Sequence, residues 1–328
     1  MTTLVVDRNN LELRSDGAAL AVYEDGERRG TVPVRLLDRV VLQGTIRLDS
    51  GVLTRLAEAG VPTVLLGGRS SRRVATMLGP AHRDASVRLA QFRCALDAAW
   101  CDRWARRIVA AKARAQLRLL RTALAERPDQ RKPLFDATGS IAAMLPTLAE
   151  EAGAVSSTVR GIEGACAAAY FRGFGALFAE SLGFSGRNRR PPKDPVNAVL
   201  SLAYTMLHFD AVRAAHIAGL DPMVGFYHRP AHGRESLASD LIEPLRPRAD
   251  AWIRVLFRDR TLRAEHFSVD KGACLLGKAG REGFYAAYEG FAVLPRRWLR
   301  RQCASLAGTL RVRGEELMEA PETAWPEE

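Results

Sequence analysis

Short apolar stretches separated by turn residues fill the first part of the chain. Apolar or alternating runs of this length are typical of β-strands, and Gly beside Asp is typical of the turns between them. One stretch, 51–58, has helical spacing instead, with Ser50 as its N-cap and Gly60 as its C-terminal stop. Strands are predicted at Leu4–Val6, Ala18–Tyr23, Thr31–Val34, Val40–Leu42 and Val61–Leu66.

The hydrophobic period changes at about residue 84, where apolar side chains recur at helical spacing, at Leu89, Phe92, Leu96 and Trp100. The pattern predicts one long amphipathic helix that ends near Leu124, with a polar side that is mostly Arg and Lys, and further helices after it. We therefore predict an α+β fold. A small β-rich domain at 1–80 precedes a larger all-α domain at 81–328, whose acidic tail is disordered from about residue 316.

A polar, basic and Pro-rich segment covers 183–194 and cannot be regular structure throughout. It is either a solvated connector or a loop that grips phosphate groups. Asp194 and Pro195 at its end are a typical N-cap and first helical residue. The helix that they start carries one polar stripe, which either lines a cleft or makes interior hydrogen bonds: Asn197, Ser201, Tyr204 and His208.

Composition favours an acidic partner. The formal net charge is +11, with 48 Lys and Arg against 37 Asp and Glu, which suits nucleic acid but also an Arg-rich proteome. The five cysteines are scattered and form no CxxC pair, which indicates free thiols in a reducing compartment. With no signal peptide or membrane-spanning apolar stretch in the sequence, we expect a cytoplasmic protein.

Three stretches that are distant in sequence carry the candidate chemistry: 161–164 with Glu163, 225–228 with His228, and 236–244 with Asp240 and Glu243. Carboxylates and an imidazole in a basic protein are suited to holding a divalent cation against a phosphodiester. Each residue also has an ordinary interpretation. Glu163 could be a surface charge, His228 a structural residue, and Asp240 a cap near the start of a helix.

In their order and residue types, these stretches resemble the sequences of the CRISPR-associated integrase family, the universal subunit of spacer acquisition. The last stretch is the most specific, although the family usually has an aromatic residue where this chain has Leu245. The resemblance covers nearly the whole chain, through the β-rich part, Gly161–Gly164 leading to Tyr170 and Phe171, Asp194–Ala198 with Ser201 and Tyr204, Gly225–His228, and Ser236–Pro247.

The resemblance implies that Glu163, His228 and Glu243 bind Mg²⁺ or Mn²⁺. It implies that Asp240 is either an auxiliary ligand or a catalytic acid that lies behind the ligands. It implies a DNA integrase that joins the 3′-hydroxyl ends of short duplex fragments to a CRISPR repeat. It further implies a homodimer formed through the β-rich domains, and a small ferredoxin-like partner that bridges two dimers. We expect DNA contacts from Arg187, Arg189, Arg190, Lys193, Asn197, Tyr170, Tyr204, Arg246 and Arg248.

Three alternatives remain open at this point. The same site could hydrolyse branched or single-stranded DNA as a metal-dependent endonuclease, without integration. The chain could be a DNA-binding scaffold that has lost its metal. It could also be an iron enzyme, which would need a second histidine such as His232.

Overall fold

A computed structural model describes residues 2–67, 72–79, 82, 84–149, 156–188 and 191–318. The chain forms two compact units. The first comprises the chain up to Arg83 together with Tyr285–Gly290, and the second comprises the rest. The division lies close to the boundary expected near residue 80, but a short helical stretch from far along the chain joins the N-terminal unit, which the sequence pattern does not indicate.

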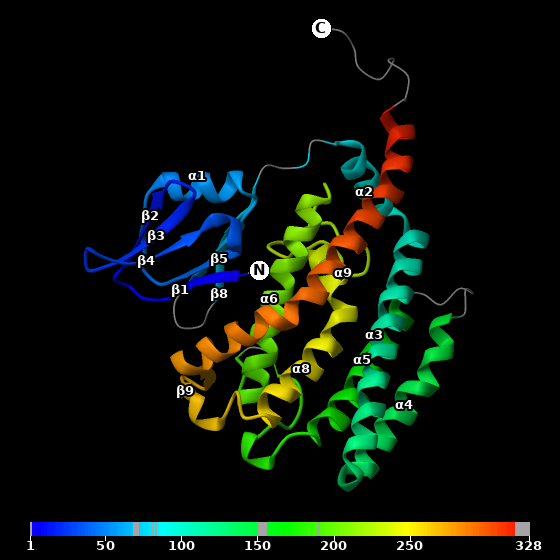
Figure 1. Ribbon diagram of the computed structural model, residues 1–328. Coiled ribbons are helices and arrows are strands. Elements are labelled where there is room, and N and C mark those ends of the chain that lie inside the picture. The colour runs from blue at the N-terminus through cyan, green and yellow to red at the C-terminus, as the bar shows by residue number, and fades with distance from the viewer. Residues whose placement is uncertain are drawn as a thin grey trace. The chain divides into compact units, whose positions relative to one another are not determined.

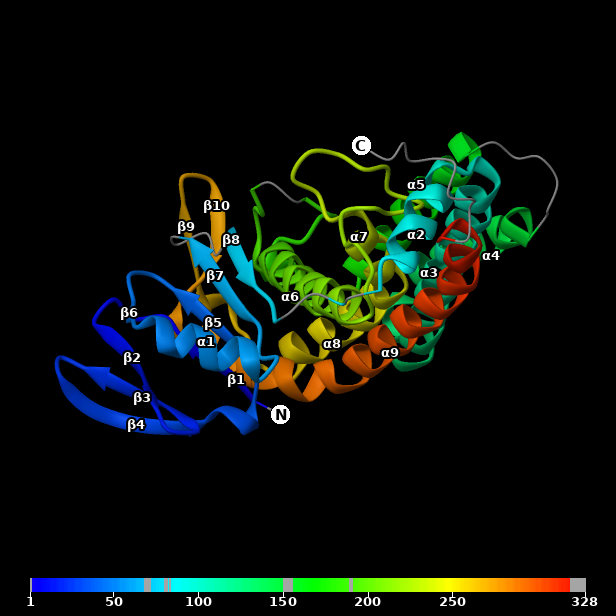
Figure 2. The same cartoon turned by 90° about the horizontal axis from the view of Figure 1, so that it is seen from above.

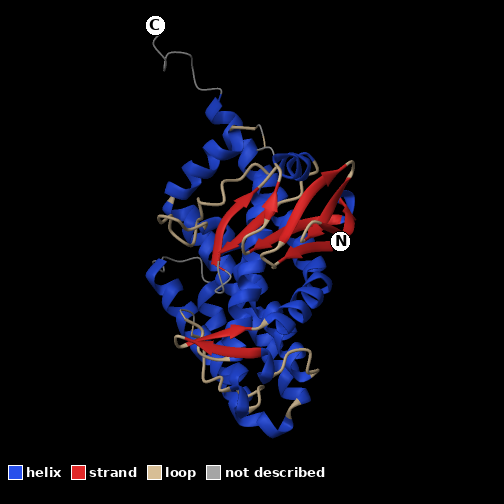
Figure 3. Cartoon of the chain, turned by 90° about the vertical axis from the view of Figure 1, so that its left-hand side faces the viewer, coloured by secondary structure: helices blue, strands red, loops and turns tan. Residues whose placement is uncertain are grey.

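The N-terminal unit contains two four-stranded sheets and one helix, drawn in blue in Figure 1 and with red strands in Figure 3. One sheet has the order β1-β5-β7-β8, with β1, β5 and β7 parallel and β8 antiparallel to β7. The other has the order β4-β3-β2-β6. The elements are β1 Thr2–Val6, β2 Leu11–Asp16, β3 Ala19–Glu24, β4 Glu27–Pro33, η1 Val34–Leu36, β5 Leu37–Gln43, β6 Arg47–Leu48, α1 Ser50–Glu58, β7 Thr63–Gly67 and β8 Arg72–Met77.

The core of this unit forms where inward-facing side chains of the strands meet α1. Leu13, Leu20, Val40 and Val52 are fully buried there. Strand β2 was missed because Leu11–Asp16 contains only two apolar residues, although it pairs with β3 along its whole length. The predicted N-cap at Ser50 was also wrong by one residue, since the Asp49 carboxylate accepts a hydrogen bond from Val52 N at 2.9 Å.

The second unit is mostly helical, as predicted, and its helices α3, α4 and α5 lie side by side in Figures 1 and 2. It departs from the predicted all-helical unit in the antiparallel hairpin of β9 and β10. Its elements are α2 Ser86–Leu96, α3 Ala98–Glu126, η2 Pro128–Gln130, α4 Arg131–Ala149, α5 Ser156–Gly175, η3 Glu180–Leu182, α6 Pro195–Ile217, α7 Ser236–Ile242, η4 Glu243–Leu245, α8 Arg246–Arg258, η5 Ala264–His266, β9 Phe267–Asp270, β10 Ala273–Leu276 and α9 Lys278–Met318.

Two helix boundaries differ from the sequence prediction. The long helix expected up to Leu124 is divided at Asp97, whose carboxylate accepts hydrogen bonds from the amides of Ala99 and Trp100 and so starts a new helix. The last helix continues to Met318, beyond the tail start expected near residue 316. The start of α6 is as predicted, because Asp194 accepts a hydrogen bond from Asn197 N at 2.8 Å.

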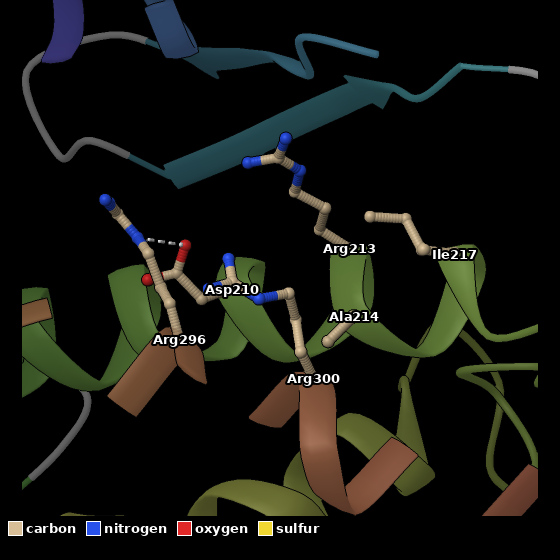
Figure 4. Close-up of a pocket in the computed structure, with 6 residues that line it drawn as sticks. All are labelled: Asp210, Arg213, Ala214, Ile217, Arg296 and Arg300. Atoms are coloured by element: carbon tan, nitrogen blue, oxygen red, sulfur yellow. Dashed lines mark hydrogen bonds and ion pairs between the residues drawn. The ribbon is translucent and has the colours of Figure 1, made fainter. Parts of the chain in front are cut away.

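A buried ion pair connects α6 with α9. Arg296 Nε lies 3.1 Å from Asp210 Oδ1, and both side chains are at most 6% exposed. Figure 4 shows Arg296 reaching from α9 to Asp210 on α6, with Arg300 one turn further along α9. This buried ion pair joins α6 to α9.

The five cysteines are free, as expected from their spacing. Of the helices that the structure describes, none combines the length and apolar character needed to cross a membrane.

Candidate active site

Two carboxylates from different parts of the chain converge on one ammonium group. Glu163 lies in the middle of α5, Glu243 begins η4, and Lys112 lies on α3, which packs against both elements. Lys112 Nζ forms an ion pair with the Glu163 carboxylate and lies 2.7 Å from Glu243 Oε2. The sequence analysis grouped the two acids in one candidate site. It counted Lys112 only on the basic polar side of a long helix, whereas its side chain is 10% exposed.

Glu243 is the more enclosed of the two acids. Burial raises the pKa of its carboxyl, but the nearby cations Arg246 and Lys112 outweigh that effect and bring the pKa down to about 2. Arg246 Nε donates to Glu243 Oε1 at 2.8 Å. Glu243 is therefore ionised at neutral pH, although it is buried.

Asp240 is fully buried and organises the loop that carries His228. Its Oδ2 accepts hydrogen bonds from the amides of Phe226 and Tyr227 at 2.8 and 2.9 Å. Its Oδ1 lies 2.8 Å from both the backbone nitrogen and the Nδ1 of His228. Consecutive amides that point at one carboxylate form an anion nest. The amides of the loop therefore stabilise the negative charge of Asp240, and Asp240 in turn orders the loop.

The loop also requires a glycine. A Cβ atom at Gly225 would lie 2.6 Å from the carbonyl carbon of Ser236 and 2.8 Å from its oxygen. These are backbone atoms at the first turn of α7, so they cannot move aside as a side chain could. Gly225 therefore lets the His228 loop approach the start of α7 closely.

The contact with Asp240 sets the tautomer of His228. Because a carboxylate can only accept, the neutral imidazole has its proton on Nδ1 and its lone pair on Nε2. Within the described part of the chain, Nε2 makes no hydrogen bond, and the side chain is 29% exposed. Asp240, predicted as an auxiliary metal ligand, as an acid behind the ligands or as a helix cap, uses both its oxygens to position the imidazole and its loop.

These residues suit a divalent cation in their chemistry. Glu163 and Glu243 already share one cation, and His228 presents a ring nitrogen that makes no hydrogen bond within the described residues. As they stand, however, no three His, Cys, Asp or Glu side chains in the described ranges are gathered tightly enough to hold a metal ion, because Lys112 lies between the two acids. His232, the second histidine that an iron site would need, is exposed and does not join them.

A buried polar cluster lies behind the site. Asp250 on α8 accepts hydrogen bonds from the hydroxyls of Tyr204 at 2.5 Å and Tyr170 at 2.8 Å. The guanidinium groups of Arg246 and Arg187 lie over the Tyr204 ring, at 4.5 and 5.6 Å from its centre. Asp250 was missed by the sequence analysis, since nothing near it in sequence indicates that two tyrosines converge on it.

These contacts correct several predicted DNA contacts. Tyr170, Tyr204 and Asn197 are at most 7% exposed, and their polar groups are bonded inside the protein. Arg187 is anchored on α6, with Nη1 2.8 Å from Asn197 Oδ1 and Nη2 3.0 Å from Ser201 Oγ. The polar stripe of α6 therefore makes interior contacts, and His208 likewise pairs with Glu235 at 3.0 Å.

The other predicted DNA contacts have different positions. Lys193 and Arg248 are exposed, and Arg246 is engaged with Glu243 and Tyr204. Arg189 and Arg190 lie outside the described residues.

Paired carboxylates and an oriented imidazole in a basic chain are suited to a class of proteins that act on phosphodiesters. Residues 4–290 match the family model of CRISPR associated protein Cas1, and the chain belongs to this family. A CRISPR-associated endonuclease Cas1 of Thermodesulfovibrio yellowstonii is 35% identical over 297 residues, which are 88% of this chain and 91% of that protein. Another from Rhodospirillum rubrum is 36% identical over 302 residues, covering 88% and 86%.

Solved structures share the fold. The Cas1 protein TM1797 of Thermotoga maritima aligns over the whole of both chains, with a TM-score of 0.80 at 19% identity. A casposase bound to its integration product aligns with 100% of this chain and 96% of its own, with a TM-score of 0.80 at 20% identity. At these identities, the similarity establishes the arrangement of elements.

The Asp250 cluster predicts a pH-dependent contribution to stability. Burial raises the pKa of Asp250 to about 6, and the Tyr204 and Tyr170 hydroxyls with Arg246 and Arg187 offset only part of that rise. The folded protein thus keeps a proton that the unfolded chain loses near pH 4, so the contribution is complete below about pH 4 and is lost as the pH rises through about 6.

We expect the free energy of unfolding of the protein, minus that of Asp250→Asn, to fall by about 3 kcal/mol between about pH 4 and pH 7. Urea unfolding at a series of pH values measures the difference. A difference that stays constant or grows with pH would contradict the raised pKa.

Proposed function

We propose that this protein is a metal-dependent DNA integrase of CRISPR adaptation. The 3′-hydroxyl of a short DNA fragment would attack a phosphodiester of the CRISPR repeat, so that one phosphodiester bond forms as another breaks. The convergence of Glu163 and Glu243 on one cation, beside an imidazole with a free nitrogen, is the observation that carries this proposal. Family membership and the net charge of +11 agree with a DNA substrate.

Glu163, Glu243 and His228 Nε2 would hold Mg²⁺ or Mn²⁺, with Mn²⁺ better matched to the nitrogen ligand. The bound ion would supply Lewis-acid polarisation of the scissile phosphate. Arg246 keeps Glu243 charged and in place, and Asp240 keeps the imidazole in the required tautomer. Because the DNA hydroxyl is the nucleophile, no side chain needs to form a covalent intermediate.

Hydrolysis is the second candidate, and the curated relatives are named endonucleases. Water would then replace the 3′-hydroxyl at the same site. A supercoiled plasmid with a CRISPR repeat, incubated with a short labelled duplex, distinguishes the two reactions. Integration transfers the label covalently to the plasmid, whereas hydrolysis nicks the plasmid without transferring it.

The proposed assembly is a homodimer joined through the N-terminal units, with a small ferredoxin-like protein bridging two dimers. A chain of a solved Cas6-RT-Cas1–Cas2 complex is similar in fold: the alignment covers 95% of this chain and 35% of that one, with a TM-score of 0.78 at 23% identity. In the N-terminal unit, Leu36 and Leu65 are 53% and 40% exposed, which offers apolar area for such a contact.

The first prediction concerns the proposed metal ligands. We expect Glu163→Gln and His228→Ala each to lower the yield of joined DNA by at least about tenfold to a hundredfold, the loss that even an outer partner of a metal ligand causes, without abolishing DNA binding. Glu180→Gln and His232→Ala are matched controls, because both residues are exposed in the same unit. Full joining activity in either ligand variant would reject the site.

The second prediction concerns the exposed cations. Replacing Lys193 and Arg248 together with Ala should reduce the slope of log affinity for duplex DNA against log salt by about 1.8, which is about 0.9 per lost phosphate contact. The control is the double replacement of Arg131 and Lys132, which are exposed on α4 and remove the same charge. An equal change in both double variants would show a general charge effect instead.

The third prediction concerns the dimer. Sedimentation equilibrium should give a mass of about twice 36.0 kDa for the protein alone. Leu36→Asp should shift the equilibrium toward the monomer, whereas Leu89→Asp, at a residue 47% exposed in the second unit, should not. A monomer at micromolar concentration would exclude the proposed assembly.

A further inference from the structure

Lys112 occupies the place between the two acids that the proposed function assigns to a metal ion. Its ammonium pairs with Glu163 from one side and Glu243 from the other. The residue is 8% exposed, and the helix α3 that carries it packs against α5 and η4. Packing therefore fixes the position of the ammonium, unlike that of a flexible lysine on the surface.

The choice of lysine at this position is notable for this chain. Only five of its 48 basic residues are lysines, and the other 43 are arginines. Lys112 is the buried one, since the others are exposed: Lys132, Lys193, Lys271 and Lys278. An ammonium is a compact point charge, whereas a guanidinium is a flat fork, so lysine is the better substitute for a small spherical cation.

The charges of the cluster balance without a metal. Glu163 and Glu243 carry two negative charges, and Lys112 and Arg246 carry two positive charges. A divalent ion added with Lys112 in place would set four positive charges against two negative ones in a partly buried site. Like charges held this close repel strongly, so the ion and the ammonium compete for the same carboxylates.

We propose that Lys112 is a resident counter-cation that keeps Glu163 and Glu243 together without metal and must move aside when a divalent ion binds. This inference rests on the proposed metal site. The ion then binds only the fraction of molecules in which the ammonium has left, which weakens its apparent affinity by that fraction. Lys112 thus sets the metal concentration at which the site fills.

Calorimetric titration with Mn²⁺ tests this inference. We expect Lys112→Met to bind Mn²⁺ about tenfold more tightly than the unaltered protein, or more, because the competing charge is gone. In EDTA, Lys112→Met should melt at a lower temperature, because two carboxylates lose a shared partner, and saturating Mn²⁺ should close most of that gap. Lys132→Met is the control, since it removes an exposed lysine from the same unit and should leave both measurements unchanged.

A measurement on the unaltered protein covers the case in which Lys112→Met does not fold. With only five lysines, ¹³Cε-labelled lysine gives a spectrum of few signals, and the Lys112 signal is the one absent from Lys112→Arg. Titration with Mg²⁺ should shift this signal, with the same midpoint as a calorimetric titration of the unaltered protein with Mg²⁺. The signals of the four exposed lysines should stay in place.

The outcomes separate this inference from the proposed function. Unchanged or weaker Mn²⁺ binding by Lys112→Met, or a Lys112 signal that stays in place at saturating Mg²⁺, overturns the counter-cation role. If the counter-cation role is overturned in this way but the unaltered protein still joins DNA in Mn²⁺, the proposed function stands. If neither protein binds Mn²⁺ and no DNA is joined, both are overturned.

Discussion

The mutual neutralisation of four charges is the interaction on which the site depends. Glu163, Glu243, Lys112 and Arg246 come from α5, η4, α3 and α8, and each needs an oppositely charged neighbour to be partly buried. Helices that are distant in sequence are therefore joined by electrostatics at one point, in addition to their apolar packing. Losing any one member leaves a charge that the interior cannot solvate.

Two neighbouring carboxyl groups, Asp240 and Asp250, are also stabilised inside the protein, but by dipoles that donate hydrogen bonds to them. Backbone amides of residues 226–228 stabilise the buried Asp240 carboxylate, and tyrosine hydroxyls surround Asp250. Arg246 connects the Asp250 cluster with the site, since it bonds Glu243 and lies over Tyr204. The scaffold thus holds Glu243 and the His228 imidazole in defined positions by contacts within the protein.

Local patterns correctly predicted the order of the two units, most of the N-terminal strands and the start of α6, because caps and periodicity act over a few residues. The family resemblance added Glu163, His228 and Glu243 as ligands of one ion, which stays a prediction. The places of Lys112 and Asp250 could not be predicted, because they depend on which helix faces meet. For the same reason, Tyr170, Tyr204 and Asn197 appeared available to DNA, whereas tertiary packing uses their polar groups inside the protein.

The close approach at Gly225 has a consequence for recognising remote homologues. An alignment score rewards histidine and acidic residues, yet both types recur by chance in many basic proteins. A residue larger than glycine at this position would collide with the backbone of Ser236 and displace the loop that aims the imidazole. Candidate sequences that retain every acid but lack this glycine should therefore not be assigned the same site, however well their other motifs agree.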